Sequence, residues 1–207
     1  MILVGQYDSP YTRRVAVSLR VLGLSYEQDP RSVFGDFESM RDVNPLRRVP
    51  SLVLDDGTVL IESSAILDWI DETVGPERAL IPPSGTARRR AMHRVAMATG
   101  AMDKAAALAL ERIVRPKAYR WPEWIERCRT QATTALAALA SEPWPADERI
   151  DQVQITTAVM IRHMRMADPE LLPRGRYPAL DALSDRCEAR PEFEATYPAE
   201  YVIPHGQ

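Results

Sequence analysis

Residues 44–70 read NPLRRVPSLVLDDGTVLIESSAILDWI, two short apolar runs followed by a helical pattern. The runs Ser51–Leu54 and Val59–Ile61 are joined by a link that contains Asp-Gly, a strong signal for a β-hairpin. Ser63 or Ser64 can then cap a helix, because a serine side chain accepts hydrogen bonds from free backbone N–H groups. The apolar residues expected on that helix are Ile66, Leu67, Trp69 and Ile70. This stretch is therefore predicted to fold as strand, strand and helix.

The residues before this stretch predict a strand, a helix and a second strand. Ile2–Val4 has the pattern of a short buried strand, and Ser25–Glu27 has that of a weaker one. Between them lie apolar residues at helical spacing, which are Val15, Leu19 and Leu22, and Gly23 ends that helix. Residues 32–44 are ambiguous, with room for one short helix. The order βαβ followed by ββα predicts a small mixed sheet with helices packed on it, an α/β domain.

From Gly85 onward the apolar residues recur only at the helical period. Prolines and glycines mark residues 75–86 as a linker, so we expect an α/β domain over residues 1–80 and an all-helical domain over residues 85–207. The helices expected in the second domain are 87–114 (with a bend at Gly100 as an alternative), 121–140, 151–166 and 178–189. Asp151 and Gln154 have the spacing of a capping box.

Composition is that of an ordinary globular protein, with 45% hydrophobic residues, 27% charged residues and a net charge of −3. This balance predicts no nucleic-acid partner and no membrane partner. The sequence has no run that could span a bilayer and no signal-peptide pattern at its start. Cys128 and Cys187 are far apart, which suits a reducing cytoplasm, and the few histidines and cysteines predict no metal site.

The motif Ser9-Pro10-Tyr11-Thr12 lies between the first strand and the first helix. Serine at the N-cap and proline at the first helical position favour a helix start. With cysteine at positions 9 and 12, the motif would be a dithiol of the thioredoxin kind. Here hydroxyls replace both sulfurs, at a helix end whose free N–H groups stabilise a thiolate. We therefore expect the site to receive a thiolate that belongs to a ligand.

Two further features flank the hairpin. Arg48-Val49-Pro50 precedes its first strand; most X-Pro bonds are trans, but a cis bond would expose the Val49 backbone N–H and C=O to a peptide-like ligand. Glu62-Ser63 follows its second strand, where Ser63 at a helix N-terminus can hold a carboxylate and Glu62 can hold an ammonium. A carboxylate and an ammonium on one carbon form the head of an amino acid. Each signal is weak alone, whereas their order along the chain is specific.

In this order of motifs the sequence resembles the cytosolic glutathione S-transferase family, in particular its serine-type, bacterial-like members. The resemblance covers nearly the whole chain and rests on SPYTRRVAVSLRVLGLSYE, on residues 44–70 and on RYPALDALSDRCEARPEF near the end. It implies a thioredoxin-like N-terminal domain, an all-helical C-terminal domain and a homodimer.

The resemblance also implies roles for single residues. Ser9 falls on the position that contacts the glutathione sulfur, and Tyr7 is the second choice for this role. The positions implied for the rest of glutathione are Val49 and Pro50 at the backbone-pairing turn, Glu62 and Ser63 at the γ-glutamyl end, and Arg48 at the glycyl carboxylate. A solvated side chain is the equally good alternative for Arg48.

The function that the resemblance implies is transfer of glutathione, as co-substrate, to an electrophilic centre of a small hydrophobic compound. In this family the electrophile pocket lies between the domains, and the residues available for it here are Tyr11, Met102, Leu108, Tyr119, Trp121 and Tyr201. Ordinary core packing is the alternative for each of them. Two other functions stay open, a glutathione-binding scaffold without turnover and a glutathione-dependent isomerase. Dithiol exchange through the motif at residues 9–12 is excluded, because positions 9 and 12 carry no cysteine.

Overall fold

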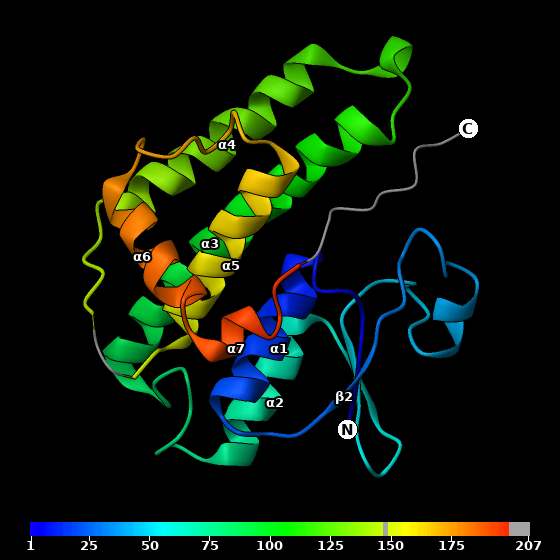
Figure 1. The fold of residues 1–207 in the computed structure, drawn as a ribbon, viewed down its shortest axis with the longest axis vertical. Helices are drawn as coiled ribbons and strands as arrows, with labels where there is room; N and C mark the ends of the chain where they lie inside the picture. The colour runs from blue at the N-terminus through cyan, green and yellow to red at the C-terminus, as the bar shows by residue number, and fades with distance from the viewer. Residues whose placement is uncertain (147–148, 199–207) are drawn as a thin grey trace. The chain divides into compact units, whose positions relative to one another are not determined.

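The computed structural model describes residues 1–146 and 149–198 (Figure 1). The described residues form two compact units: Met1–Arg88 joins the segment that begins at Arg190, and Arg89–Ala189 forms the second unit. The long helix α3 (Gly85–Ile113) begins in the first unit and continues in the second. The linker over residues 75–86, as a boundary between two domains, stays a prediction.

The first unit contains a four-stranded mixed sheet in the order β2-β1-β3-β4. Its strands are β1 (Ile2–Val4), β2 (Glu27–Asp29), β3 (Ser51–Val53) and β4 (Val59–Ile61). β1 pairs in parallel with β2 and antiparallel with β3, and β3 pairs antiparallel with β4. Leu3 and Leu52, both fully buried, are direct partners at the centre of the sheet. The predicted order βαβ followed by ββα is confirmed.

The edge strand β2 lies further along the chain than the sequence pattern predicts, at Glu27–Asp29 instead of Ser25–Glu27. None of its side chains is buried, so no apolar alternation marks its position. Backbone pairing with β1 sets its register instead, from Ile2 opposite Glu27 to Val4 opposite Asp29. In the ambiguous region that follows, the short helix is a 3₁₀ turn, η1 (Ser39–Asp42).

Helices α1 (Pro10–Val21) and α2 (Ser63–Val74) pack against each other in the first unit (Figure 1). α1 matches its prediction, and Gly23 follows it with a φ of 68°, a conformation that glycine adopts freely. The start of α2 does not match. Glu62 occupies the N-cap position, and Ser63 is already the first helical residue, so the prediction of Ser63 or Ser64 as the cap is wrong.

A short helix, α7 (Pro191–Glu194), packs against α1 although the sequence patterns do not predict it. Arg13 of α1 makes this link, with a side chain that is only 1% exposed. Its Nε donates to the Thr196 carbonyl at 3.0 Å and its Nη2 donates to the Phe193 carbonyl at 3.2 Å. The guanidinium carbon also lies 5.6 Å from the centre of the Phe193 ring. The segment after Arg190 is thus fixed to the helix that begins beside Ser9.

The second unit is helical. Besides α3, its elements are η2 (Lys117–Tyr119), α4 (Pro122–Ala140), α5 (Gln152–Ala167) and α6 (Pro178–Glu188). α3 and α4 form a long hairpin with η2 at its tip (Figure 1), and α3 continues through Gly100 without a break. The capping box of α5 is confirmed: Asp151 Oδ1 accepts from the Gln154 N–H at 2.8 Å, and Gln154 Oε1 accepts from the Asp151 N–H at 3.0 Å.

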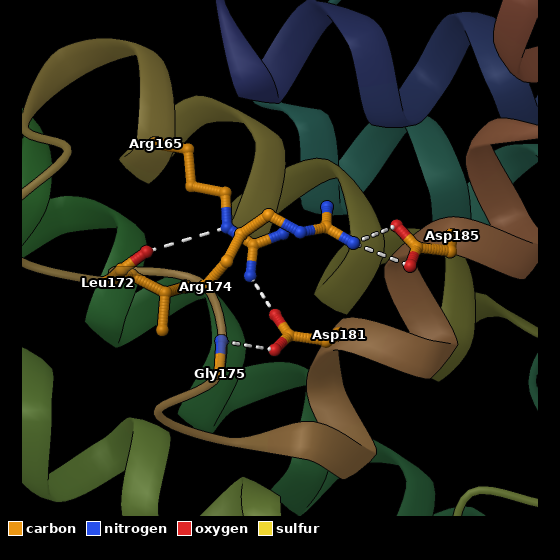
Figure 2. Close-up of polar contacts among 6 residues, drawn as sticks. All are labelled: Arg165, Leu172, Arg174, Gly175, Asp181 and Asp185. Atoms are coloured by element: carbon orange, nitrogen blue, oxygen red, sulfur yellow. Dashed lines mark hydrogen bonds and ion pairs between the residues drawn. The ribbon is translucent and has the colours of Figure 1, made fainter.

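A polar cluster joins α6 to the end of α5 (Figure 2). The Asp181 carboxylate accepts from the Gly175 N–H at 2.7 Å and from the Arg165 guanidinium. Burial alone would raise the pKa of Asp181, but these hydrogen bonds and the charges of Arg165 and Arg174 hold its pKa below the usual value. Arg174 in turn pairs with Asp185 at 2.6 Å. The cluster therefore favours the ionised form of Asp181.

Across residues 1–146 and 149–198, no helix is long and apolar enough to cross a membrane. The same residues contain no group of histidine, cysteine, aspartate and glutamate side chains arranged to hold a metal ion. Cys128 and Cys187 are both buried and form no disulfide.

Candidate functional site

Ser9 is the N-cap of α1, as predicted. Its backbone is extended (φ −69°, ψ 116°), and its Oγ accepts from the Thr12 N–H at 3.3 Å. Pro10 is the first helical residue. A serine hydroxyl both accepts and donates, and within the described part of the chain the Ser9 hydroxyl has no acceptor. Its proton is therefore available to a ligand at the N-terminal end of α1.

The hydroxyl of Tyr7, the second choice for the sulfur contact, is hydrogen-bonded to Tyr26. Its hydroxyl lies 2.9 Å from the Tyr26 hydroxyl, which also accepts from Arg20 Nε at 3.2 Å. Burial and the hydrogen bond to Tyr26 raise the pKa of Tyr7 well above its usual value. The phenol is already part of a hydrogen-bonded pair, and the raised pKa disfavours its ionisation further.

The turn before β3 presents open backbone groups. The Val49–Pro50 peptide bond is cis, and among the described residues neither the N–H nor the C=O of Val49 has a hydrogen-bonding partner. Asn44, which sequence reasoning did not single out, holds the turn: its Nδ2 donates to the Arg48 carbonyl at 2.8 Å and its Oδ1 accepts from the Leu46 N–H at 2.9 Å. The sequence signal for this turn is the Asn-Pro pair at residues 44–45, which is typical of turns.

Gly5 brings this turn and the start of α1 close together at the end of β1. A Cβ atom at Gly5 would lie 2.5 Å from Thr12 Oγ1 and 2.9 Å from Val49 Cβ, closer than real atoms approach. Its φ of 133° is also a conformation that side-chain-bearing residues rarely adopt. The absence of a side chain at Gly5 thus allows both Thr12 and Val49 to pack against the end of β1.

Arg48 and Glu62 meet on the surface of the first unit. Arg48 Nη1 lies 3.2 Å from Glu62 Oε1, with both side chains largely exposed. Glu62 has a φ of 67°, a left-handed conformation that costs a non-glycine residue about 1–3 kcal/mol. Such strained residues often lie at ligand-binding sites. Glu62 occupies the N-cap position of α2 and makes no side-chain capping bond there.

Ser63 accepts hydrogen bonds from Arg14, a residue that the sequence patterns did not single out. Arg14 of α1 donates to Ser63 Oγ from Nε at 3.1 Å and from Nη2 at 2.7 Å. Both side chains are buried, with 3% of Arg14 and 2% of Ser63 exposed. No short-range pattern could have indicated this pair, because its members lie 49 residues apart.

The residues predicted for an electrophile pocket lie in different parts of the chain. Tyr11 is half-buried in the first turn of α1, and Met102 is fully buried in α3. Leu108, in the same helix, is buried as well. Tyr119 and Trp121, at the tip of the α3–α4 hairpin, are 73% and 62% exposed. Tyr201 lies outside the described residues, and the pocket stays a prediction.

Comparisons with known sequences and solved structures find similar proteins over nearly the whole chain. Residues 3–78 match the family described as "Glutathione S-transferase, N-terminal domain". A glutathione S-transferase from Methylobacterium radiotolerans, solved in complex with glutathione sulfonate, is 30% identical with a TM-score of 0.88, covering 98% of this chain and 96% of that one. A glutathione transferase family member from Pseudomonas fluorescens Pf-5, with bound glutathione, is 31% identical with a TM-score of 0.84, covering 96% and 98%.

Curated relatives align over a similar length. A probable maleylacetoacetate isomerase 1 of Drosophila melanogaster is 27% identical over 206 residues, covering 96% of this chain and 81% of the relative. A maleylacetoacetate isomerase of Pseudomonas aeruginosa is 27% identical over 210 residues, covering 96% of both chains.

Proposed function

Because the chain belongs to the glutathione S-transferase family of enzymes, we propose that it binds glutathione in its first unit and transfers it to an electrophilic carbon of a small hydrophobic compound. The observation that carries this proposal is the Ser9 hydroxyl, whose proton is free for donation at the N-terminal end of α1. A ligand thiolate placed there gains a hydrogen bond and a favourable helix end.

Each part of glutathione has a partner in this proposal. The γ-glutamyl carboxylate binds Ser63 and its ammonium binds Glu62, while the cysteinyl backbone pairs with Val49 beside Pro50. The glycyl carboxylate reaches Arg48. An exposed ion pair such as Arg48–Glu62 is worth little in water, so the charges of the ligand can replace it.

Ser9 can supply the required activation. A free thiol with a pKa of about 8.5 is only a few per cent thiolate at neutral pH. Lowering this pKa by roughly two units requires about 2.7 kcal/mol of differential stabilisation. A hydrogen bond to a charged partner contributes about 1.5–3 kcal/mol, and a helix N-terminus contributes about 0.3–2 kcal/mol more. The two contributions together are sufficient.

In the transfer step the thiol proton passes to solvent, and the sulfur forms a bond to the electrophilic carbon as the leaving group departs with the bonding electrons. Tyr11 lies two positions after Ser9, and we assign it to the acceptor side of the sulfur. We propose Met102, Tyr119 and Trp121 as further pocket residues; Met102 is fully buried and would have to become exposed. We also propose that the enzyme acts as a homodimer in the cytoplasm.

A glutathione-dependent isomerase is the second candidate, because relatives that carry the name maleylacetoacetate isomerase align with 96% of this chain. The same thiolate would add reversibly to a carbon–carbon double bond. After rotation about the resulting single bond it would leave again, so glutathione is not consumed. The two candidates share the site around Ser9 and differ in the product.

The test is a pH titration of protein-bound glutathione, in which thiolate absorbance reports the thiol pKa. We expect a bound pKa about one to two units below the free value, and an increase by a similar amount in Ser9→Ala, with kcat/KM reduced roughly 10- to 100-fold. Ser64→Ala, at an exposed serine of the same kind, serves as the matched control. An unshifted pKa in the wild-type protein would overturn the proposal.

Product analysis then separates the candidates. An aryl halide should yield the glutathione conjugate if the enzyme is a transferase, whereas a cis-configured unsaturated diketo acid should yield its trans isomer if it is an isomerase. Binding of glutathione without either product would leave a scaffold that does not turn over.

A further inference from the structure

Helix α1 carries two neighbouring buried arginines that contact different parts of the first unit. Arg13 donates to carbonyls of the segment after Arg190, at Thr196 and Phe193. Arg14 instead donates from two nitrogens of its guanidinium to one oxygen, Ser63 Oγ, at 3.1 and 2.7 Å. The second arginine therefore touches a residue of the proposed glutathione site.

The contact with Arg14 restricts what the Ser63 hydroxyl can do. A serine oxygen has two acceptor lone pairs and one donor proton. The two N–H groups of Arg14 fill the acceptor sites, so the O–H of Ser63 is left to act as a donor. Hydrogen bonds from a cation also polarise the hydroxyl and strengthen its own donation. A hydroxyl committed to donation suits an anionic partner.

We infer that Arg14 is a positioning residue for the γ-glutamyl carboxylate of glutathione, acting through Ser63. The inference rests on the proposed function, in which that carboxylate binds Ser63. Arg14 fixes the serine rotamer, directs the hydroxyl proton to the ligand, and adds its positive charge to the N-terminal end of α2. Its own side chain is too deeply buried to bind the tripeptide from solvent.

A merely structural role for Arg14 makes a different prediction. If the arginine only holds α1 against α2, its replacement should weaken every ligand of the site to the same extent. If it acts through Ser63 on a carboxylate, the loss should depend on whether the ligand carries that carboxylate. The second ligand is therefore the tripeptide in which a 4-aminobutanoyl group replaces the γ-glutamyl group, because it keeps the amine and the thiol but lacks this carboxylate.

The experiment measures Kd for both ligands by titration calorimetry with the full chain. We expect Arg14→Lys, which keeps the charge but loses the two-nitrogen contact, to weaken glutathione binding about tenfold and binding of the analogue less than about twofold. In Ser63→Ala, adding Arg14→Lys should cause less than about twofold further loss, because the intermediary is gone. Arg13→Lys, the adjacent buried arginine, is the matched control and should leave the ratio of the two affinities unchanged.

The inference would be overturned if Arg14→Lys weakened the binding of both ligands equally. It would also be overturned if the affinity losses of Arg14→Lys and Ser63→Ala multiplied in the double variant. Either result would leave the proposed function intact. If the wild-type protein fails to bind glutathione, the proposed function falls and takes the inference with it. Melting curves check that each variant is folded. Should Arg14→Lys not fold, Arg14→Gln, which keeps an N–H donor near Ser63 but no charge, must give the same selective loss.

Discussion

Ser9 and Ser63 stand at the starts of two helices, yet their hydroxyls are held in different ways. Ser9 Oγ accepts from a backbone N–H of its own helix, three residues ahead. Ser63 Oγ accepts from Arg14 on another helix. The first arrangement follows from the local sequence, whereas the second exists only after α1 and α2 have packed. For this reason the N-cap position of Ser9 could be predicted from a short motif, whereas the contact that holds Ser63 could not.

At the same scale, Tyr7→Phe tests which hydroxyl serves the sulfur. The Tyr7 hydroxyl is paired with that of Tyr26, and the raised pKa of Tyr7 disfavours its ionisation further. We therefore expect the variant to leave the bound thiol pKa unchanged and to lose about 0.5–1.5 kcal/mol of stability, the worth of one hydrogen bond. Thiolate absorbance and urea unfolding measure the two quantities.

Tyr26→Phe removes the same hydrogen bond from the other side and also the one that Arg20 Nε donates at 3.2 Å, so it should lose at least as much stability as Tyr7→Phe. A thiol pKa that rises by a unit or more in Tyr7→Phe alone would move the sulfur contact from Ser9 to Tyr7.

Among the elements, those with strong local signals were predictable. The Asp-Gly link gave the β3–β4 hairpin, and Pro10 after Ser9 gave the start of α1. Asp151 and Gln154 cap α5 as their spacing indicates. The elements that were misplaced or missed are held by distant partners: β2 by its pairing with β1, and α7 by Arg13. Sequence periodicity carries no information on such contacts, because they join residues far apart in the chain.

The residues of the candidate site also fall into those that the sequence predicted and those that it did not. The positions of Ser9, Val49 and Glu62 came from motifs and the family resemblance. The contact of Arg14 with Ser63 did not, because it joins residues 49 positions apart in the chain. The contacts of Asn44 are local, and the Asn-Pro pair is a turn signal that the sequence patterns did offer. The surface pair of Arg48 with Glu62 also depends on how the turn before β3 meets the start of α2.

The junction of α5 and α6 gives a prediction at the scale of elements. The pKa of Asp181 is lower in the folded state than in the unfolded chain, where it is about 4. The ionised carboxylate therefore stabilises the fold at pH values above about 4, and this stabilisation is lost as the pH falls through the folded-state pKa. Asp181→Asn should therefore lower stability by about 1–3 kcal/mol at pH 7 and make stability less sensitive to acid below about pH 4. Urea unfolding across this pH range measures both effects.

Asp185→Asn is the control for this test, because Asp185 pairs with Arg174 on an exposed surface and should contribute little. If the two variants had the same effect at every pH, the cluster in Figure 2 would be a surface feature without a role in joining α5 to α6.

For the whole molecule, ligand binding should be visible as stabilisation. Glutathione at a hundred times its Kd adds about 2.7 kcal/mol to the folded state, which for a chain of this size raises Tm by roughly 5–10 °C. We expect this shift in the melting transition that contains the first unit, measured by scanning calorimetry. Ser63→Ala should shift less at the same concentration, and a wild-type transition that does not move in excess glutathione would argue against binding.

The contacts of Arg13 with Phe193 and Thr196 affect when the first unit can finish folding during synthesis. The ribosome makes Met1–Arg88 first, but the carbonyls that Arg13 needs belong to Phe193 and Thr196. At about 5–20 residues per second, roughly 5–20 s pass between these two points of synthesis. During that interval Arg13 lacks the two carbonyls that it contacts in the finished fold. The unit that is made first is therefore completed only after α3 to α6 have been made, and a chain that stops before α7 leaves the ribosome with its first helix incompletely packed.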